Sequence, residues 1–163
     1  MATRADFTDE EWHRLGRAPL VAGMAISLAD PGGPIEAVKE TSAALRAIVD
    51  DGRQGTYGDL VREISEDVAE RGSRRENPMA GFKATGPDAR EEILRELRAV
   101  NDLLVAKTTP EEAAQFREWL KTAAQRTAQA AKEGGFMGFH AERVSENEQK
   151  MLETLGEIFG SPS

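Results

Sequence analysis

One stretch of this chain decides its fold, and it reads Leu20-Val21-Ala22-Gly23-Met24-Ala25-Ile26-Ser27-Leu28-Ala29. A helix over these residues is apolar on every side, which is typical of a helix at the centre of a bundle. The stretch is about half as long as a membrane-spanning helix, which needs about 20 apolar residues. We therefore expect residues 20–28 to form a central helix with other helices packed around it.

Outward from this stretch, two capping patterns mark the starts of helices. Thr8 is followed three residues later by Glu11, and this capping box predicts a short first helix. Thr109 and Glu112 repeat the pattern, with Pro110 at the first helical position. The helix that follows carries apolar or small residues every three or four positions, at Ala113, Phe116, Leu120, Ala123, Thr127 and Ala130.

Glycine and proline residues divide the remaining helical patterns. Gly16 and Pro19 are expected to separate the short first helix from the central one, because both residue types disfavour helix interiors. The run Asp50-Asp51-Gly52 is expected to close a helix that begins near Ile35. Further helical patterns cover residues 55–68, 87–104 and 145–159, and Ser145 with Glu148 opens the last of them as a third capping box. The sequence thus predicts an all-α fold, a single-domain bundle of about six helices over residues 1–163.

Residues 72–86 interrupt this helical periodicity. The segment contains Gly, Ser and Pro, and it is long for a connection inside a compact domain. We expect a mobile internal loop there, and a flexible tail over residues 160–163.

The composition excludes several classes of function. The chain contains no cysteine, which removes disulfides, thiol catalysis and cysteine-based metal sites. Its formal net charge is −8, and its one basic cluster (Arg71, Arg74 and Arg75) lies in a segment with few aromatic residues, which argues against nucleic-acid binding. No apolar run near the N-terminus resembles a signal peptide. We expect a soluble, cytoplasmic protein with neither a membrane nor a nucleic-acid partner.

Recognisable catalytic constellations are missing from the sequence. His13 follows Glu10 by three residues and so matches half of a di-iron carboxylate motif, but the other histidine, His140, has Met137 in the corresponding place. The glycines of residues 134–138 do not follow a strand pattern, so they are not a dinucleotide-binding fingerprint. We therefore expect no enzymatic activity and no cofactor.

Residues 134–145 are unusually apolar for a connection between helices, because loops are normally polar. The candidate interaction residues in this segment are Phe136, Met137, Phe139 and His140. Two interpretations remain open. The segment either fills the core at the end of the bundle or forms an exposed patch for an unknown protein partner or a second copy of the chain.

Several segments carry a resemblance to a known family. They cover residues 7–12, 18–25, 29–31, 130–136 and 143–146, and in them the chain resembles a family of uncharacterised bacterial all-helical proteins. The resemblance implies a helical fold over nearly the whole chain and brings no assigned activity. In that family the aromatic loop is richer in glycine. His140 departs from this pattern, which lowers any metal role for this residue.

A second, looser likeness is to the tellurite-resistance TerB-like helical domains, which place acidic residues at the turns of helix pairs. Asp30 and Glu36 hold such positions here. This likeness implies metal binding and a stress response, with Asp30, Glu36 and Glu40 as oxygen ligands for a hard cation. The leading hypothesis is a non-enzymatic module for protein interaction or self-association, and the alternative is a small acidic metal-binding domain of the TerB-like kind.

Overall fold

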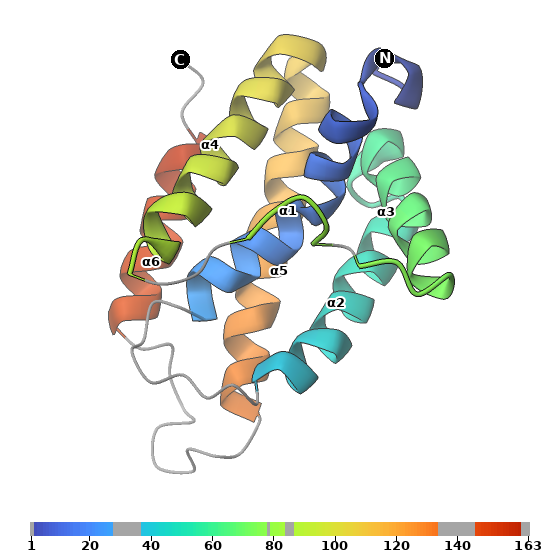
Figure 1. Cartoon of the computed structure of the whole chain (residues 1–163). Helices are drawn as coiled ribbons and strands as arrows, with labels where there is room; N and C mark the ends of the chain where they lie inside the picture. Colours follow the sequence, from blue (N-terminus) through green and yellow to red (C-terminus); the bar gives the residue numbers. More distant parts are fainter. Residues whose placement is uncertain (1, 28–36, 78, 84–86, 134–145, 161–163) are drawn as a thin grey trace.

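Six α-helices make up most of the described chain and pack as a bundle (Figure 1). The computed structural model describes residues 2–27, 37–77, 79–83, 87–133 and 146–160. After a short 3-10 turn (Arg4–Asp6), the helices are α1 (Asp9–Ser27), α2 (Ala37–Arg53), α3 (Gly58–Ser73), α4 (Ala89–Lys107), α5 (Pro110–Glu133) and α6 (Glu146–Gly160). No strand occurs within these ranges, and the predicted all-α bundle is confirmed.

The centre of the bundle is formed by α1 and α5. These two helices pack against each other, and each also contacts α2, α3, α4 and α6. Figure 1 shows α1 between the α2–α3 pair and the α4–α6 pair. The buried residues of α1 include Leu15, Ala18, Val21, Ala22, Ala25 and Ile26. The central apolar helix predicted from residues 20–28 is therefore confirmed as far as Ile26.

The helix α1 is continuous through Gly16 and Pro19, so the predicted break between two helices is wrong. A proline in a helix interior removes one backbone hydrogen bond and costs about 3 kcal/mol. Both residues are buried, and a Cβ built on Gly16 would lie 3.1 Å from Cγ2 of Val68 in α3. Burial of this apolar segment among the other helices outweighs the local cost, because tertiary packing supplies most of the stability of protein helices.

The capping boxes predicted at Thr8 and Thr109 are present, and Ser145, the start of a third predicted box with Glu148, lies outside the described residues. The backbone N–H of Glu11 donates to Thr8 Oγ1 at 3.1 Å, and the backbone N–H of Thr8 donates to Glu11 Oε1 at 2.8 Å. Thr109 and Glu112 form the same reciprocal pair, with both distances 3.1 Å. The backbone N–H of Ala2 also donates to the Glu112 carboxylate, at 3.1 and 3.2 Å. This contact attaches the N-terminal residues to the start of α5.

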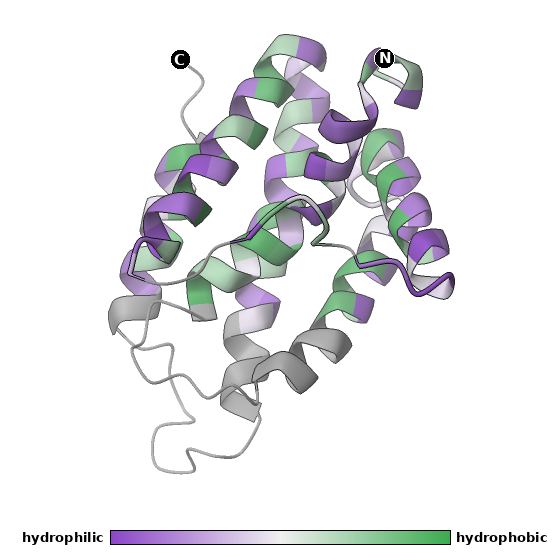
Figure 2. Ribbon diagram, viewed as in Figure 1, coloured by the Kyte–Doolittle hydropathy of each residue, from purple (hydrophilic) through white to green (hydrophobic). Residues whose placement is uncertain are grey.

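Trp119 joins α5 to α2 inside the core. Its side chain is 1% exposed, and its Nε1 donates to the carbonyl oxygen of Ile48 at 3.0 Å. The indole ring also meets the ring of Phe116 edge to face, with the centroids 5.5 Å apart. Figure 2 shows hydrophobic and hydrophilic residues alternating along α3 and α4, as expected for helices that are buried on one side.

The helix α2 ends at Arg53, one residue after the Asp50-Asp51-Gly52 run predicted to close it, so this helix end is confirmed to within one residue. Arg126 of α5 binds the Asp51 carboxylate at two points, with Nε 2.5 Å from Oδ2 and Nη2 3.0 Å from Oδ1. A carboxylate near a helix C-terminus is unfavourable by itself. The two-point ion pair compensates for that unfavourable position of Asp51 in the last turn of α2.

The helix α3 extends to Ser73, which lies inside the predicted loop over residues 72–86. The connection to α4 is attached to α1 by Arg17, whose Nη1 donates to the carbonyl oxygen of Ala80 at 3.2 Å. The same guanidinium group forms a buried ion pair with Glu96 of α4, with Nη2 3.0 Å from Oε1. The mobility of the connection stays a prediction.

The last helix, α6, ends at Gly160, the first residue of the predicted tail, and residues 161–163 lie outside the described ranges. Across the described helices, none is both long and apolar enough to cross a membrane.

Candidate functional site: the groove between α2 and α3

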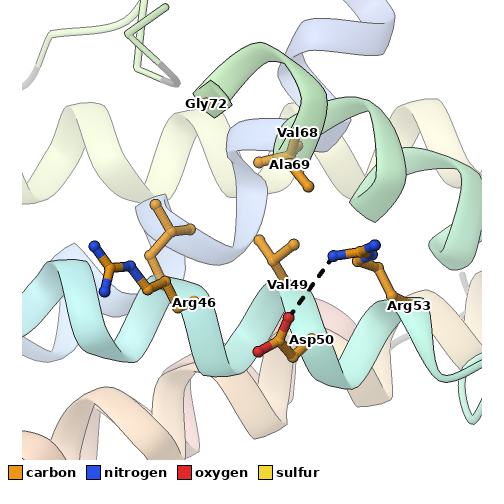
Figure 3. A pocket seen from close by; sticks show the side chains of 8 residues that line it. Arg46, Val49, Asp50, Arg53, Val68, Ala69 and Gly72 are labelled. Carbon is orange, nitrogen blue, oxygen red and sulfur yellow. Dashed lines mark ion pairs between the residues drawn. The ribbon is translucent and has the colours of Figure 1, made fainter. Parts of the chain in front are cut away.

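A pocket of about 410 Å³ lies between α2 and α3. Its lining consists of Leu45, Arg46, Val49, Asp50 and Arg53 from α2 and Val68, Ala69 and Gly72 from α3 (Figure 3). We call this pocket the α2–α3 groove. Its volume falls within the range of about 300–1,000 Å³ that is typical of binding clefts.

The groove begins where the closest contact between the two helices ends. At that contact a Cβ built on Gly52 would lie 1.9 Å from Ser65 Oγ and 3.2 Å from Val61 Cγ1. One helical turn further along each helix, Val49 and Val68 are buried and line the groove. The tight contact therefore sets the spacing of the helix pair, and the groove opens beside it.

Small side chains on α3 keep the groove open. Ala69 is half-buried, as is Leu45 opposite on α2, and a Cβ built on Gly72 would meet no atom within 4 Å. The α3 residues that line the groove carry no charge. An apolar side chain from another molecule can therefore approach the backbone of α3 closely at this wall.

All the charged groups that line the groove come from α2. Nη1 of Arg53 lies 4.0 Å from Oδ1 of Asp50, with side chains that are 52% and 66% exposed, so this pair adds little stability (Figure 3). Arg46 is exposed and forms no ion pair with another residue of the described lining. The rim thus carries two guanidinium groups and one carboxylate, a net positive charge on a chain whose net charge is −8.

The groove offers groups that can bind a partner. Its described lining offers aliphatic groups, guanidinium groups and one carboxylate, and it contains no imidazole, hydroxyl or thiol. Removing aliphatic surface from water favours association by about 25 cal/mol per Å², a gain that must exceed the entropic cost of binding. The charges at the rim then favour one sign of ligand over the other. That the chain has no enzymatic activity stays a prediction.

The interaction residues predicted from the sequence lie outside the part of the chain that the structure describes: Phe136, Met137, Phe139 and His140. Two of the candidate metal ligands, Asp30 and Glu36, also lie outside it. Glu40 belongs to α2, but its side chain is not among those described. The interaction role of the apolar segment and the metal site therefore both stay predictions.

No metal cluster appears elsewhere in the described ranges, where no group of three or more His, Asp or Glu residues is placed to hold an ion. His13, half of the di-iron motif considered above, lies half-buried on α1, and Glu10 is exposed.

Sequence reasoning did not predict the α2–α3 groove. Leu45, Val49 and Val68 recur at helical spacing with other apolar residues, and this spacing predicts only that each helix has an apolar face. The groove lies where Ala69 and Gly72, with a small side chain or none, follow the larger Val68 along α3. A step from large to small residues along an apolar face is the pattern that indicates such a gap.

Comparison with protein-family models, with curated proteins and with solved structures finds no match to this chain. The resemblances to bacterial all-helical proteins and to TerB-like domains therefore stay predictions from the sequence segments that carry them. The groove is the feature from which a function is best argued.

Proposed function

We propose that the chain is a protein-interaction module and that its α2–α3 groove holds an apolar segment of a partner protein. The observation that carries this proposal is the half-buried apolar lining at Leu45 and Ala69. Elsewhere on the described surface, Val105 is the one large hydrophobic residue that is exposed, at 54%. Half-buried hydrophobic side chains also occur elsewhere, for example at Met24, Phe82 and Ile158, whereas in the groove they line a pocket, the shape that typically holds a ligand.

A helix is the partner element that fits this shape best. The α2 and α3 helices are joined by the short connection over residues 54–57, so they run antiparallel. The groove between two such helices accepts the side-chain ridge of a third helix, which is a common mode of peptide recognition. The part of α2 that lines the groove, residues 45–53, is about 12 Å long, or somewhat more than two turns.

The sequence argues for a protein partner in the cytoplasm. A net charge of −8 disfavours polyanions such as nucleic acid, and the absence of cysteine suits a reducing compartment. The alternative function, metal binding in a stress response, depends on Asp30, Glu36 and Glu40, and no described side chain favours it. A melting temperature that rises with millimolar manganese or calcium is the result that supports the alternative.

The proposal is tested with a neutral helical peptide and the full ¹⁵N-labelled chain. The peptide has about 18 residues, enough for a stable alanine-based helix. It carries leucines at i+3 and i+4 between glutamines at i and i+7, which places all four side chains on one face. We expect titration with this peptide to shift the backbone amide signals of residues 45–53 and 68–72. Shifts confined to other helices contradict the proposal.

A groove-filling variant makes the test specific. In Gly72→Leu the new side chain leans toward the preceding turn of its helix, over Ala69, and so occupies the groove. Gly156→Leu on α6 is the matched control, because a Cβ at either glycine meets no atom within 4 Å. We expect the first variant to weaken peptide binding at least tenfold and the second to leave it unchanged, with helical circular dichroism retained in both.

A further inference from the structure

We infer that the segment held by the α2–α3 groove is acidic on both sides of its apolar residues, so that the partner presents carboxylates to Arg46 and Arg53. This inference rests on the proposed function and adds the chemistry of the partner to it. It is carried by the charge of the rim and by the spacing of its two guanidinium groups.

The rim of the groove differs in charge from the chain as a whole. The chain has 29 acidic and 21 basic residues, so its net charge repels another acidic molecule. The groove has the opposite balance, with Arg46, Arg53 and a single carboxylate, Asp50. Oδ1 of Asp50 lies 4.0 Å from Nη1 of Arg53 on the same helix. Because both side chains are exposed, the two groups stay largely hydrated and can exchange this contact for one with a partner. A basic partner meets repulsion here, whereas an acidic one does not.

The spacing of Arg46 and Arg53 determines where the carboxylates of the partner must lie. Arg46 and Arg53 are seven residues apart on α2, which is two turns or about 10 Å. Figure 3 shows the two side chains toward opposite ends of the groove, with Val49 between them. A helix lying along the groove matches this spacing with acidic residues at i and i+7 and places its residues i+3 and i+4 over the apolar lining. The partner is therefore recognised as a helix with an apolar centre flanked by acidic residues.

The inference is tested with three peptides that differ only at positions i and i+7, which hold glutamate, glutamine or lysine. Dissociation constants are measured by titration of the full chain at low ionic strength, because salt screens exposed charges. Exposed ion pairs are individually weak, so we expect the glutamate peptide to bind about fivefold more tightly than the glutamine peptide, and the lysine peptide to bind most weakly. The difference should shrink at 0.5 M salt, where the screening length is a few ångströms.

Charge variants of the chain assign the preference to the rim. The double variant Arg46→Gln/Arg53→Gln should lose the preference for the glutamate peptide, because Asp50 is then the one charge in the described lining, and Arg46→Glu/Arg53→Glu should bind the lysine peptide most tightly. Arg98→Glu is the control, since Arg98 is exposed on α4, a helix that packs against α1, α5 and α6. It changes the net charge of the chain without changing the groove, and it should keep the order found for the wild type.

The outcomes separate this inference from the proposed function. Equal binding of all three peptides in the groove, or tighter binding of the lysine peptide, overturns the inference and leaves the groove as an interaction site. The absence of shifts at residues 45–53 and 68–72 with any peptide overturns both. Shifts of those signals with protein concentration alone would identify a second copy of the chain as the occupant, and would overturn the acidic-partner inference.

Discussion

Gly52 of α2 and Ser65 of α3 meet so closely that a Cβ on the glycine would lie 1.9 Å from the serine Oγ. Gly52 is buried, and the fully buried Ser65 has no hydrogen-bond partner for its hydroxyl in the described structure. This contact sets the spacing of the two helices whose groove we assign to partner binding. Its disruption therefore tests the packing on which the site depends.

Substitution of the glycine should destabilise the fold. We expect Gly52→Ala to lower the free energy of unfolding by about 1–3 kcal/mol, because the added methyl group overpacks a tight contact. Alanine is intrinsically better than glycine in a helix by up to about 1 kcal/mol, and the clash must exceed that gain. Chemical denaturation measures the effect, with Gly156→Ala as a control that should be neutral or stabilising. A Gly52→Ala protein as stable as the wild type contradicts this account of the contact.

Removal of the Ser65 hydroxyl should change the free energy of unfolding in the opposite direction. A buried hydroxyl without a partner costs free energy, so we expect Ser65→Ala to be neutral or to stabilise the chain by about 1 kcal/mol. It should also recover part of the stability lost in Gly52→Ala, because the shortest contact is removed. A double-mutant cycle measures this coupling. Additive effects of the two substitutions would show that the residues do not interact in this way.

The buried ion pair between Arg17 and Glu96 should be sensitive to loss of one partner. The two side chains are 3% and 8% exposed, and the pair joins α1 to α4. We expect Glu96→Gln to lower the free energy of unfolding by about 3–5 kcal/mol, because it leaves a buried guanidinium without a counter-charge. Glu118→Gln, in an exposed pair with Lys121, should cost less than about 1 kcal/mol. Equal effects of the two substitutions on the denaturation midpoint would contradict the structural role of the buried pair.

The stability of the fold at acidic pH should depend on Glu11. A hydrogen bond from Lys107 Nζ, at 2.7 Å, and the backbone N–H of Thr8 lower the pKa of this carboxyl group below its ordinary value. The folded state therefore binds the proton less readily than the unfolded state. The resulting stabilisation is present above the unfolded-state pKa and is lost as the pH falls through the lowered, folded-state pKa.

The variant Lys107→Met removes the largest cause of that shift. We expect it to melt below the wild type near pH 7 and to approach the wild type in acid, where Glu11 is protonated in both proteins. Thermal denaturation across the pH range measures the difference. A gap in melting temperature that stays constant from neutral pH into acid would show that the contact does not act through this carboxylate.

The features of the fold that could be predicted from the sequence are those that depend on local patterns. The capping boxes at Thr8 and Thr109 and the buried face of α5 follow from residue spacing, and the structure confirms them. The break predicted at Gly16 and Pro19 is wrong, because the local cost of these residues is offset by the packing of α1 against distant residues such as Val68. Such contacts do not show in a single stretch of sequence.

The candidate site could not be predicted for the same reason. The groove is a gap between two apolar faces, and its existence depends on the spacing set by Gly52 and Ser65 and on the short side chains of Ala69 and Gly72. The sequence instead indicated residues 134–145 as a candidate interaction segment, because they are unusually apolar for a connection between helices. An apolar segment is visible in a sequence, whereas an unfilled space between helices is visible only once the helices are placed.

The most direct test of the central claim compares the binding of the glutamate-flanked leucine peptide to Gly72→Leu and to Gly156→Leu. Both variants add the same side chain to a helical glycine with open space around it, and only the first fills the α2–α3 groove. The account predicts a dissociation constant at least tenfold higher for Gly72→Leu and a wild-type value for Gly156→Leu. Equal dissociation constants for the two variants would contradict the claim that this groove is where the chain holds a partner.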